Sequence, residues 1–216
     1  MPTRYIAEID QSKEDRDKLR ENQYLLQVAK AVATGDKPEF NVVYASKILA
    51  PHMNVQWTTK YGLNWATDMP APGSEVMYSG TWQQCELGSS YTLDQDGDWS
   101  AKQENPHAKP DSLNVASNDY AVGVHIPVGV RDPTSKKWTP IWFGKNMLLT
   151  GTHGEYQPIE TVNIWYQEGQ RTATMISDQS TSVQPYEMPP SRPVYFSYDA
   201  IKGKWRTPQD QPFEFP

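Results

Sequence analysis

Apolar and polar positions alternate without a break from Asn54 to Ala66. Every second residue from Val55 to Trp65 is apolar or a threonine, and polar residues or glycine fill the positions between. Successive side chains of a β-strand point to opposite faces, whereas a helix would spread these positions around its circumference. A period of two over this length is typical of a strand with one buried face. The pattern therefore predicts one long strand here and a core built from a β-sheet.

The same period recurs along much of the chain. Alternating or β-branched runs predict further strands at residues 76–82, 91–94, 120–128, 138–143, 162–166, 171–176 and 194–198. Residues 101–118 contain two prolines and few apolar residues, so they predict a long surface loop. The fold class expected is mainly β: an antiparallel β-sandwich of roughly ten strands with one N-terminal α-helix. A single domain should cover residues 1–216 and end in a Pro-rich tail at about 206–216.

The helix is expected at about residues 12–34. Ser12 and Asp15 resemble a capping pair at its start, and Gly35 follows its end. The first half is almost entirely charged, and the apolar residues crowd into the second half. One interpretation is a surface helix whose second half packs on the sheet; the other is a detachable amphipathic helix that meets a membrane or a partner. Because the apolar part is too short to span a bilayer, we expect it to pack on the sheet.

Charge and cysteine content narrow the class of protein. A formal net charge of −6 argues against nucleic-acid binding, which calls for a basic face. Cys85 is the only cysteine, so no disulfide forms within the chain. The first residues lack the apolar run of a secretory signal, and no stretch approaches the ~20 apolar residues of a membrane-spanning helix. These features predict a cytoplasmic protein, or one released without a signal peptide.

No stretch has the spacing of a catalytic or metal-binding motif. The four histidines show none of the spacings of zinc sites. Asp94, Asp96 and Asp98 resemble the start of a calcium loop, but Gly97 comes too early and no glutamate follows at the required position. Residues 150–154 lack the length and the lysine of a phosphate loop. We therefore expect no catalytic residue, no metal and no cofactor.

With catalytic and metal-binding motifs excluded, the remaining candidates for a binding site are aromatic residues that have amide or acidic residues beside them in the sequence. The chain contains 8 Trp and 12 Tyr. A planar ring packs on the apolar face of a sugar or on a choline head group, while nearby polar groups orient the ligand. Trp57 and Trp65 belong to the alternating strand and should lie in the core. The candidate ligand-binding residues are Trp99, Trp138, Trp142, Trp165, Asn163 and Asp98.

One family resemblance rests on two segments and on the order of elements. Residues 120–128 read Tyr-Ala-Val-Gly-Val-His-Ile-Pro-Val and lead to residues 138–144, Trp-Thr-Pro-Ile-Trp-Phe-Gly. Together with an N-terminal amphipathic helix before an aromatic-rich β-sandwich, residues 12 to 180 resemble the actinoporin-like group of pore-forming cytolysins and fruit-body lectins. The resemblance implies recognition of glycans or phospholipid head groups. The charged stretch from Lys13 to Arg20 departs from the cytolysin pattern, and no binding residue transfers one by one.

Two functions from different classes follow. The leading hypothesis is a non-catalytic protein that binds carbohydrate or a lipid head group through exposed aromatics, with peripheral membrane contact and a homo-oligomer left open as further partners. The alternative is a small-molecule isomerase, cyclase or hydrolase in which His125, Asp119 and Tyr120 act inside a closed β-barrel. A third is a structural protein that binds a partner through its N-terminal helix. Whether the sheet encloses a cavity or packs as layers discriminates between the first two.

Overall fold

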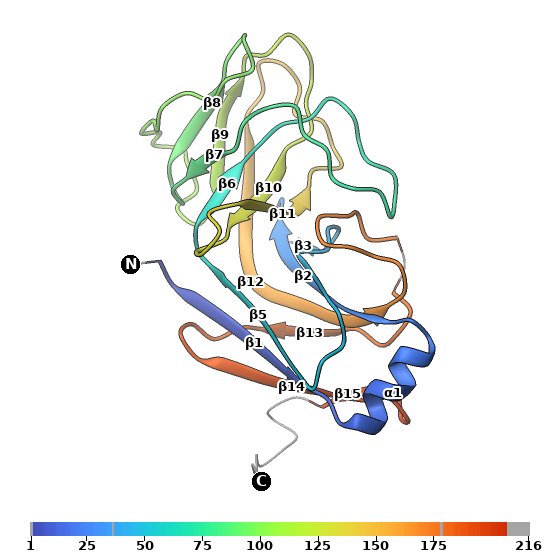
Figure 1. Cartoon of the computed structure of the whole chain (residues 1–216). Coiled ribbons are helices and arrows are strands. Elements are labelled where there is room, and N and C mark those ends of the chain that lie inside the picture. Colours follow the sequence, from blue (N-terminus) through green and yellow to red (C-terminus); the bar gives the residue numbers. More distant parts are fainter. Residues whose placement is uncertain (1, 36, 178, 207–216) are drawn as a thin grey trace.

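The structure is a computed structural model that describes residues 2–35, 37–177 and 179–206. The mainly β class with one helix is confirmed (Figure 1). Apart from Arg206, the expected Pro-rich tail lies outside the described residues. Among the residues described, no helix is long and apolar enough to cross a membrane.

The first sheet, called the terminal sheet, joins strands from both ends of the chain. Across the sheet its strands are β15 (Lys204–Arg206), β14 (Pro193–Asp199), β1 (Arg4–Asp10) and β5 (His52–Thr58). Strands β1 and β14 run parallel, and the other pairs are antiparallel.

The second sheet, called the glycine sheet, is antiparallel throughout. Its strands in order are β11 (Trp138–Phe143), β10 (Pro127–Arg131), β6 (Tyr61–Leu63) and β7 (Gln83–Cys85). The two inner strands pair Gly129 directly with Gly62.

The third sheet, called the large sheet, is built on the 14-residue strand β12 (Gly154–Gln167). Its main path runs β3 (Pro38–Glu39), β2 (Leu25–Ala33), β12, β9 (Leu113–Asn118) and β8 (Ser90–Leu93), while β13 (Gln184–Glu187) pairs with β12 and β4 (Ala45–Lys47) pairs with β2. A bulge shifts the register of β12 between Ile159 and Val162, where the strand curves (Figure 1). A bulge bends its strand and changes the direction of the side chains beside it.

All three sheets contribute to one main core. The buried residues include Ile9 and Trp57 from the terminal sheet, Leu63 and Val128 from the glycine sheet, and Val28 and Ile164 from the large sheet. Each of the three sheets keeps two edges, so the described strands form open sheets rather than a closed barrel. The two-layer sandwich of roughly ten strands is not confirmed, because the strands are spread over three sheets.

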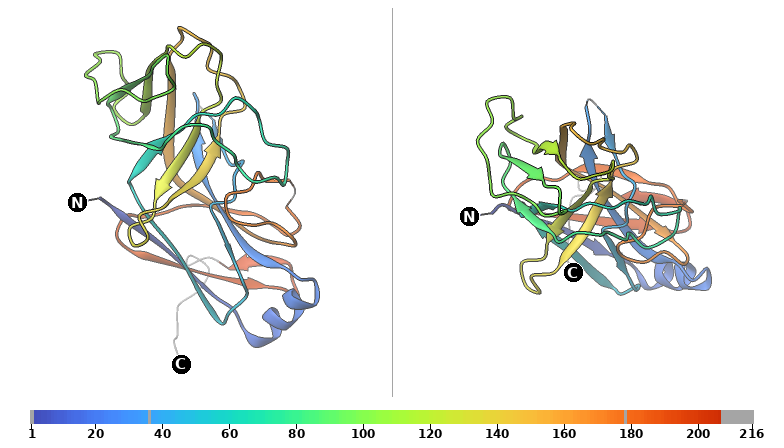
Figure 2. Two further views of the ribbon diagram at one scale, coloured as in Figure 1. Left: turned by 45° about the horizontal axis from the view of Figure 1, so that its top comes forward. Right: turned by 90° about the horizontal axis from the view of Figure 1, so that it is seen from above.

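The expected helix at 12–34 is wrong in its second half. Helix α1 spans Lys13–Glu21, with Ser12 as its N-cap, and residues 25–33 form strand β2. The chain turns at Gln23, whose φ of 55° is incompatible with continuing the helix. Because β2 is central and buried on both faces, its near-continuous apolar run carries no period of two and resembles a helical stripe. Figure 2 shows α1 at the end of the molecule away from the loops beside β8.

Other segments also differ from expectation. The strand expected at 120–128 starts only at Pro127, and residues 120–126 and 171–176 contribute no more than isolated bridges. The long alternating run is two strands in different sheets, because it breaks at Thr59 and Lys60 after β5 and resumes as β6. Residues 76–82 form no strand, although β7, which starts directly after them, does pair with β6. Residues 113–118, expected in a loop, form β9, whose parallel partner β8 lies far enough away in sequence to leave no hairpin signal.

Candidate functional site

The outer face of the glycine sheet holds two tryptophans over a pair of glycines. Trp138 starts β11 at one edge of the sheet, and Trp82 comes just before β7 at the other edge. A Cβ atom added to Gly62 would lie 2.7 Å from the Trp138 ring, and one added to Gly129 would lie 2.6 Å from the Trp82 ring. Both rings therefore reach inward across the sheet and rest where only glycine leaves room.

These rings belong to a larger cluster, which we call the aromatic patch: Tyr78, Trp82 and Trp138, with Arg131 and Gln84 beside them. The two indoles stack with centroids 5.4 Å apart and planes at 16°, and Tyr78 meets Trp82 edge-on at 5.2 Å. The Arg131 guanidinium lies 6.0 Å from the Trp138 ring centre and donates a hydrogen bond to Gln84 Oε1 at 3.1 Å. Tyr78 is exposed and both indoles are half-buried, so the patch presents ring surface to solvent.

A groove of about 390 Å³ runs beside the aromatic patch. Tyr78 and Trp138 form part of its wall, with Met77, Pro140 and Glu75. Met77 is 68% exposed, so it is a flexible apolar side chain on the rim. A mainly apolar wall with one carboxylate suits a ligand that has both a nonpolar face and hydroxyl groups.

Of the expected site residues, Trp138 alone lies in the patch and its groove. Trp165, which was expected to contact ligand, lies instead in the core, where its ring is fully buried beside Ala29 and its Nε1 donates to Gln167 Oε1 at 2.8 Å. Trp142 is only 2% exposed and packs against Tyr156.

The other three expected residues lie elsewhere. Trp99 is half-buried and packs against the main core at the tip of a hairpin. Asp98 is exposed on the same tip, where its backbone N–H donates to Asp94 Oδ1 at 2.9 Å. Asn163 is a half-buried residue of β12. The sequence did not single out Tyr78 or Trp82. Only the pairing of Gly62 with Gly129 shows that aromatic rings cover the outer face of the glycine sheet.

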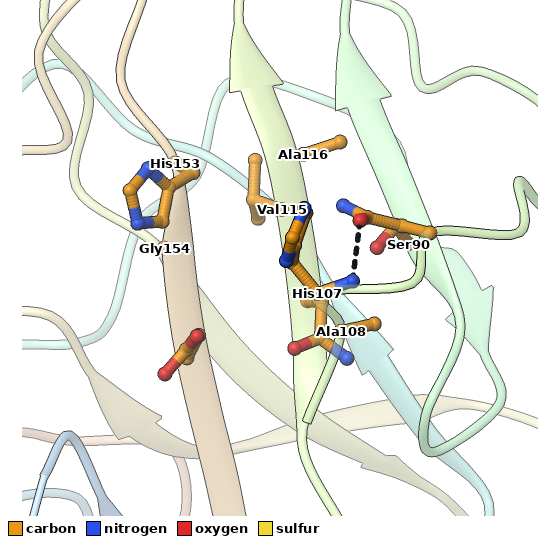
Figure 3. Close-up of a pocket in the computed structure, with 10 residues that line it drawn as sticks. Ser90, His107, Ala108, Val115, Ala116, His153 and Gly154 are labelled. Carbon is orange, nitrogen blue, oxygen red and sulfur yellow. Dashed lines mark hydrogen bonds between the residues drawn. The ribbon is translucent and has the colours of Figure 1, made fainter. Parts of the chain in front are cut away.

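Two cavities flank the start of β12. One, of about 380 Å³, is lined by Ser90, His107, Val115 and His153 among others; Figure 3 shows the two imidazoles on opposite sides of it. The second, of about 450 Å³, shares His153 and the two following residues with the first. In the described ranges, no group of three or more His, Cys, Asp or Glu residues could hold a metal ion.

A buried charged cluster ties the three sheets together. Glu160, in the bulge of β12, accepts hydrogen bonds from Lys30 Nζ of β2 at 2.8 Å, from Trp57 Nε1 of β5 at 2.7 Å and from the Tyr61 hydroxyl of β6. The Lys30 side chain is fully buried, and that of Glu160 is 19% exposed. Lys30 Nζ also lies 4.2 Å from the centre of the Trp57 ring.

The pKa values of this cluster are shifted by burial and by mutual attraction. Burial lowers the pKa of Lys30, although the charge of Glu160 opposes that change. Burial alone would raise the pKa of Glu160, but the charge and hydrogen bond of Lys30 and the hydrogen bonds from Tyr61 and Trp57 outweigh it and leave that pKa lowered. The carboxylate is therefore held ionised, as a structural link between sheets.

The residues of the barrel-enzyme hypothesis do not share one interior. His125 is buried against Phe143, and its Nδ1 lies 2.7 Å from the Gly144 carbonyl oxygen. Asp119 is exposed, and Tyr120 packs on Trp65 with ring centroids 4.7 Å apart. Since the described sheets are open, the enclosed site that this hypothesis requires is not formed.

Comparison with family models, curated proteins and solved structures finds no match to this chain. The actinoporin-like resemblance therefore stays a prediction.

Proposed function

We propose that this protein is a non-catalytic carbohydrate-binding protein and that the aromatic patch is its binding surface. The observation that carries the proposal is the stack of Trp82 and Trp138 over the paired glycines Gly62 and Gly129. The glycines hold both rings in one position while leaving ring surface exposed, so the surface is rigid before a ligand arrives. Preorganisation of this kind lowers the entropy cost of binding.

The groups around the rings match the chemistry of a sugar. The nonpolar face of a pyranose packs on an indole, as apolar C–H groups do on aromatic faces. Gln84, Arg131 and the carboxylate of Glu75 lie within or beside the same surface and supply donors and acceptors for hydroxyl groups.

A phospholipid head group is the other ligand that aromatic rings suit, and the local charges favour sugar over it. The Arg131 guanidinium is already engaged by Gln84 Oε1 and by the Lys136 carbonyl oxygen at 3.1 Å. Glu75 in the groove repels a phosphate. A neutral sugar does not require a free guanidinium and is not repelled by the Glu75 carboxylate.

A glycan array and vesicle flotation test the proposal directly. The wild-type protein is compared with Trp138→Ala and with the control Leu149→Ala, which removes a side chain that is 61% exposed on a different loop. We expect glycan binding that Trp138→Ala abolishes and Leu149→Ala preserves, with circular dichroism confirming that both variants fold. The proposal would be contradicted if the wild-type protein bound no glycan on the array. It would also be contradicted if the protein floated with vesicles and the Trp138→Ala change left that flotation unaffected.

A further inference from the structure

The cavity of about 450 Å³ beside β12 has an aromatic floor. Trp142 and Tyr156 line it, with ring centroids 5.7 Å apart and planes at 52°, and both residues are buried. Its rim includes Glu39, Lys145 and His153. We call this cavity the Trp142 pocket. Its lining residues are separate from those of the groove beside the aromatic patch.

One of the aromatic residues that line the Trp142 pocket carries a buried donor without a partner in the described ranges. Trp142 is 2% exposed, and among the described residues its Nε1 has no hydrogen-bond partner. The neighbouring cavity repeats this feature, since Ser90 is fully buried and its Oγ also lacks a partner in the described part of the chain. Figure 3 shows the Ser90 side chain directed toward the cavity. Buried polar groups are nearly always paired, so a polar ligand that reached either group would supply a hydrogen bond that the described residues do not.

The charges around the Trp142 pocket balance one another. Glu39 Oε2 lies 3.6 Å from Lys145 Nζ, and Glu155 Oε2 lies 2.5 Å from Lys109 Nζ. The two carboxylates would repel an anion, and the two ammonium groups would repel a cation. Neither kind of ion therefore gains net electrostatic attraction from entering the pocket. The ligand that fits is neutral, has a nonpolar face for the aromatic floor and carries oxygen atoms that both donate and accept.

We propose that the Trp142 pocket binds one neutral pyranose unit. The nonpolar face of the sugar packs on Trp142 and Tyr156, a sugar oxygen accepts from Trp142 Nε1, and sugar hydroxyls donate to the carboxylates of Glu39 and Glu155. Because solvent does not reach Nε1, binding requires a small displacement of the rim, where Lys145 and Met147 are exposed and unbranched. This site does not depend on the aromatic patch and stands whether or not the patch binds glycans.

The test is a titration with methyl glycosides of glucose, galactose, mannose and N-acetylglucosamine, followed in the ¹H–¹⁵N spectrum of the indole groups. We expect one glycoside to shift the Nε1 signal of Trp142, assigned with the Trp142→Phe variant. Trp142→Phe keeps an aromatic ring but removes the N–H, and it should weaken binding by about tenfold, the value of one hydrogen bond.

Two further variants keep the proposal falsifiable if Trp142→Phe does not fold. Glu39→Gln alters the rim of the pocket and should also weaken binding, whereas Trp138→Ala, in the aromatic patch, should leave the Trp142 signal shift unchanged. No shift of the Trp142 signal with any glycoside would overturn the proposal. Equal affinity of the wild-type protein, Trp142→Phe and Glu39→Gln would do so as well.

Discussion

Replacing Glu160 with glutamine should destabilise this protein more than any other single change to a charged group described here. The carboxylate accepts from Lys30, Trp57 and Tyr61, which come from all three sheets. Glutamine keeps the size of the side chain but leaves the fully buried Lys30 ammonium without a counter-charge. The Glu160→Gln change therefore measures the contribution of the negative charge to stability with little change in side-chain packing.

The expected magnitude follows from the burial of each partner. Removing one member of a buried ion pair costs about 3–5 kcal/mol, because the other charge is left unpaired. The glutamine oxygen still accepts from Trp57 or Tyr61, so we expect about 3 kcal/mol, a large part of the 5–15 kcal/mol typical of whole domains. Lys30→Met should cost less, since the 19% exposed Glu160 side chain keeps two donors and some contact with water.

Urea denaturation at neutral pH, followed by tryptophan fluorescence, measures these differences as shifts of the midpoint at constant slope. Glu86→Gln is the matched control, because Glu86 pairs with Lys102 at the surface, where the two side chains are 67% and 50% exposed. Such a pair contributes under about 1 kcal/mol. A loss for Glu160→Gln no larger than that of Glu86→Gln, or a larger loss for Lys30→Met, would refute the reasoning.

Three smaller predictions concern other parts of the fold. Gly129→Ala places a Cβ 2.6 Å from the Trp82 ring, so it should cost about 1–3 kcal/mol in thermal denaturation by overpacking; an unchanged melting temperature would contradict this. The hydrogen bond that His52 Nδ1 donates to the Asp10 carboxylate raises the pKa of His52, so the stabilisation is complete below about pH 6.5 and lost as pH rises through the raised pKa. His52→Gln should remove that decline from the pH dependence of the urea midpoint, and an identical profile would argue against it. Ser12→Ala removes the N-cap of α1 and should cost about 1 kcal/mol in the same assay, whereas an unshifted midpoint would disprove the cap.

Periodicity located strands with one exposed face, but it missed strands buried on both faces and predicted strands at 76–82 and 120–126 that do not form. The strand at 194–198 was predicted within one residue of its bounds, because its buried and less buried positions alternate. The strand at 138–143 was also predicted at its bounds, although its last four residues are all buried. The run at 25–33 was assigned to a helix, because a central strand of a mixed sheet has no polar face to reveal its period. Likewise, β9 pairs in parallel with β8 and lacks the turn signal that marks a hairpin.

The candidate site was predicted only in part for a similar reason. Trp138 was selected from its position near a turn, and the structure places it in the aromatic patch. Its partner Trp82 lies 56 residues earlier in the sequence, and the two meet because Gly62 and Gly129 face each other across β6 and β10. Pairing between distant strands is not encoded in local pattern, so no window of sequence could reveal this contact.

The most direct test of the account is the affinity of Trp138→Ala for the glycan identified on the array, measured by isothermal titration calorimetry beside the wild-type protein and Leu149→Ala. If the aromatic patch is the binding surface, loss of the Trp138 ring should weaken binding by at least about tenfold, as truncation of a central aromatic contact does. The control should bind like the wild type. Equal affinity of all three proteins would show that the sugar binds elsewhere and would contradict the central claim.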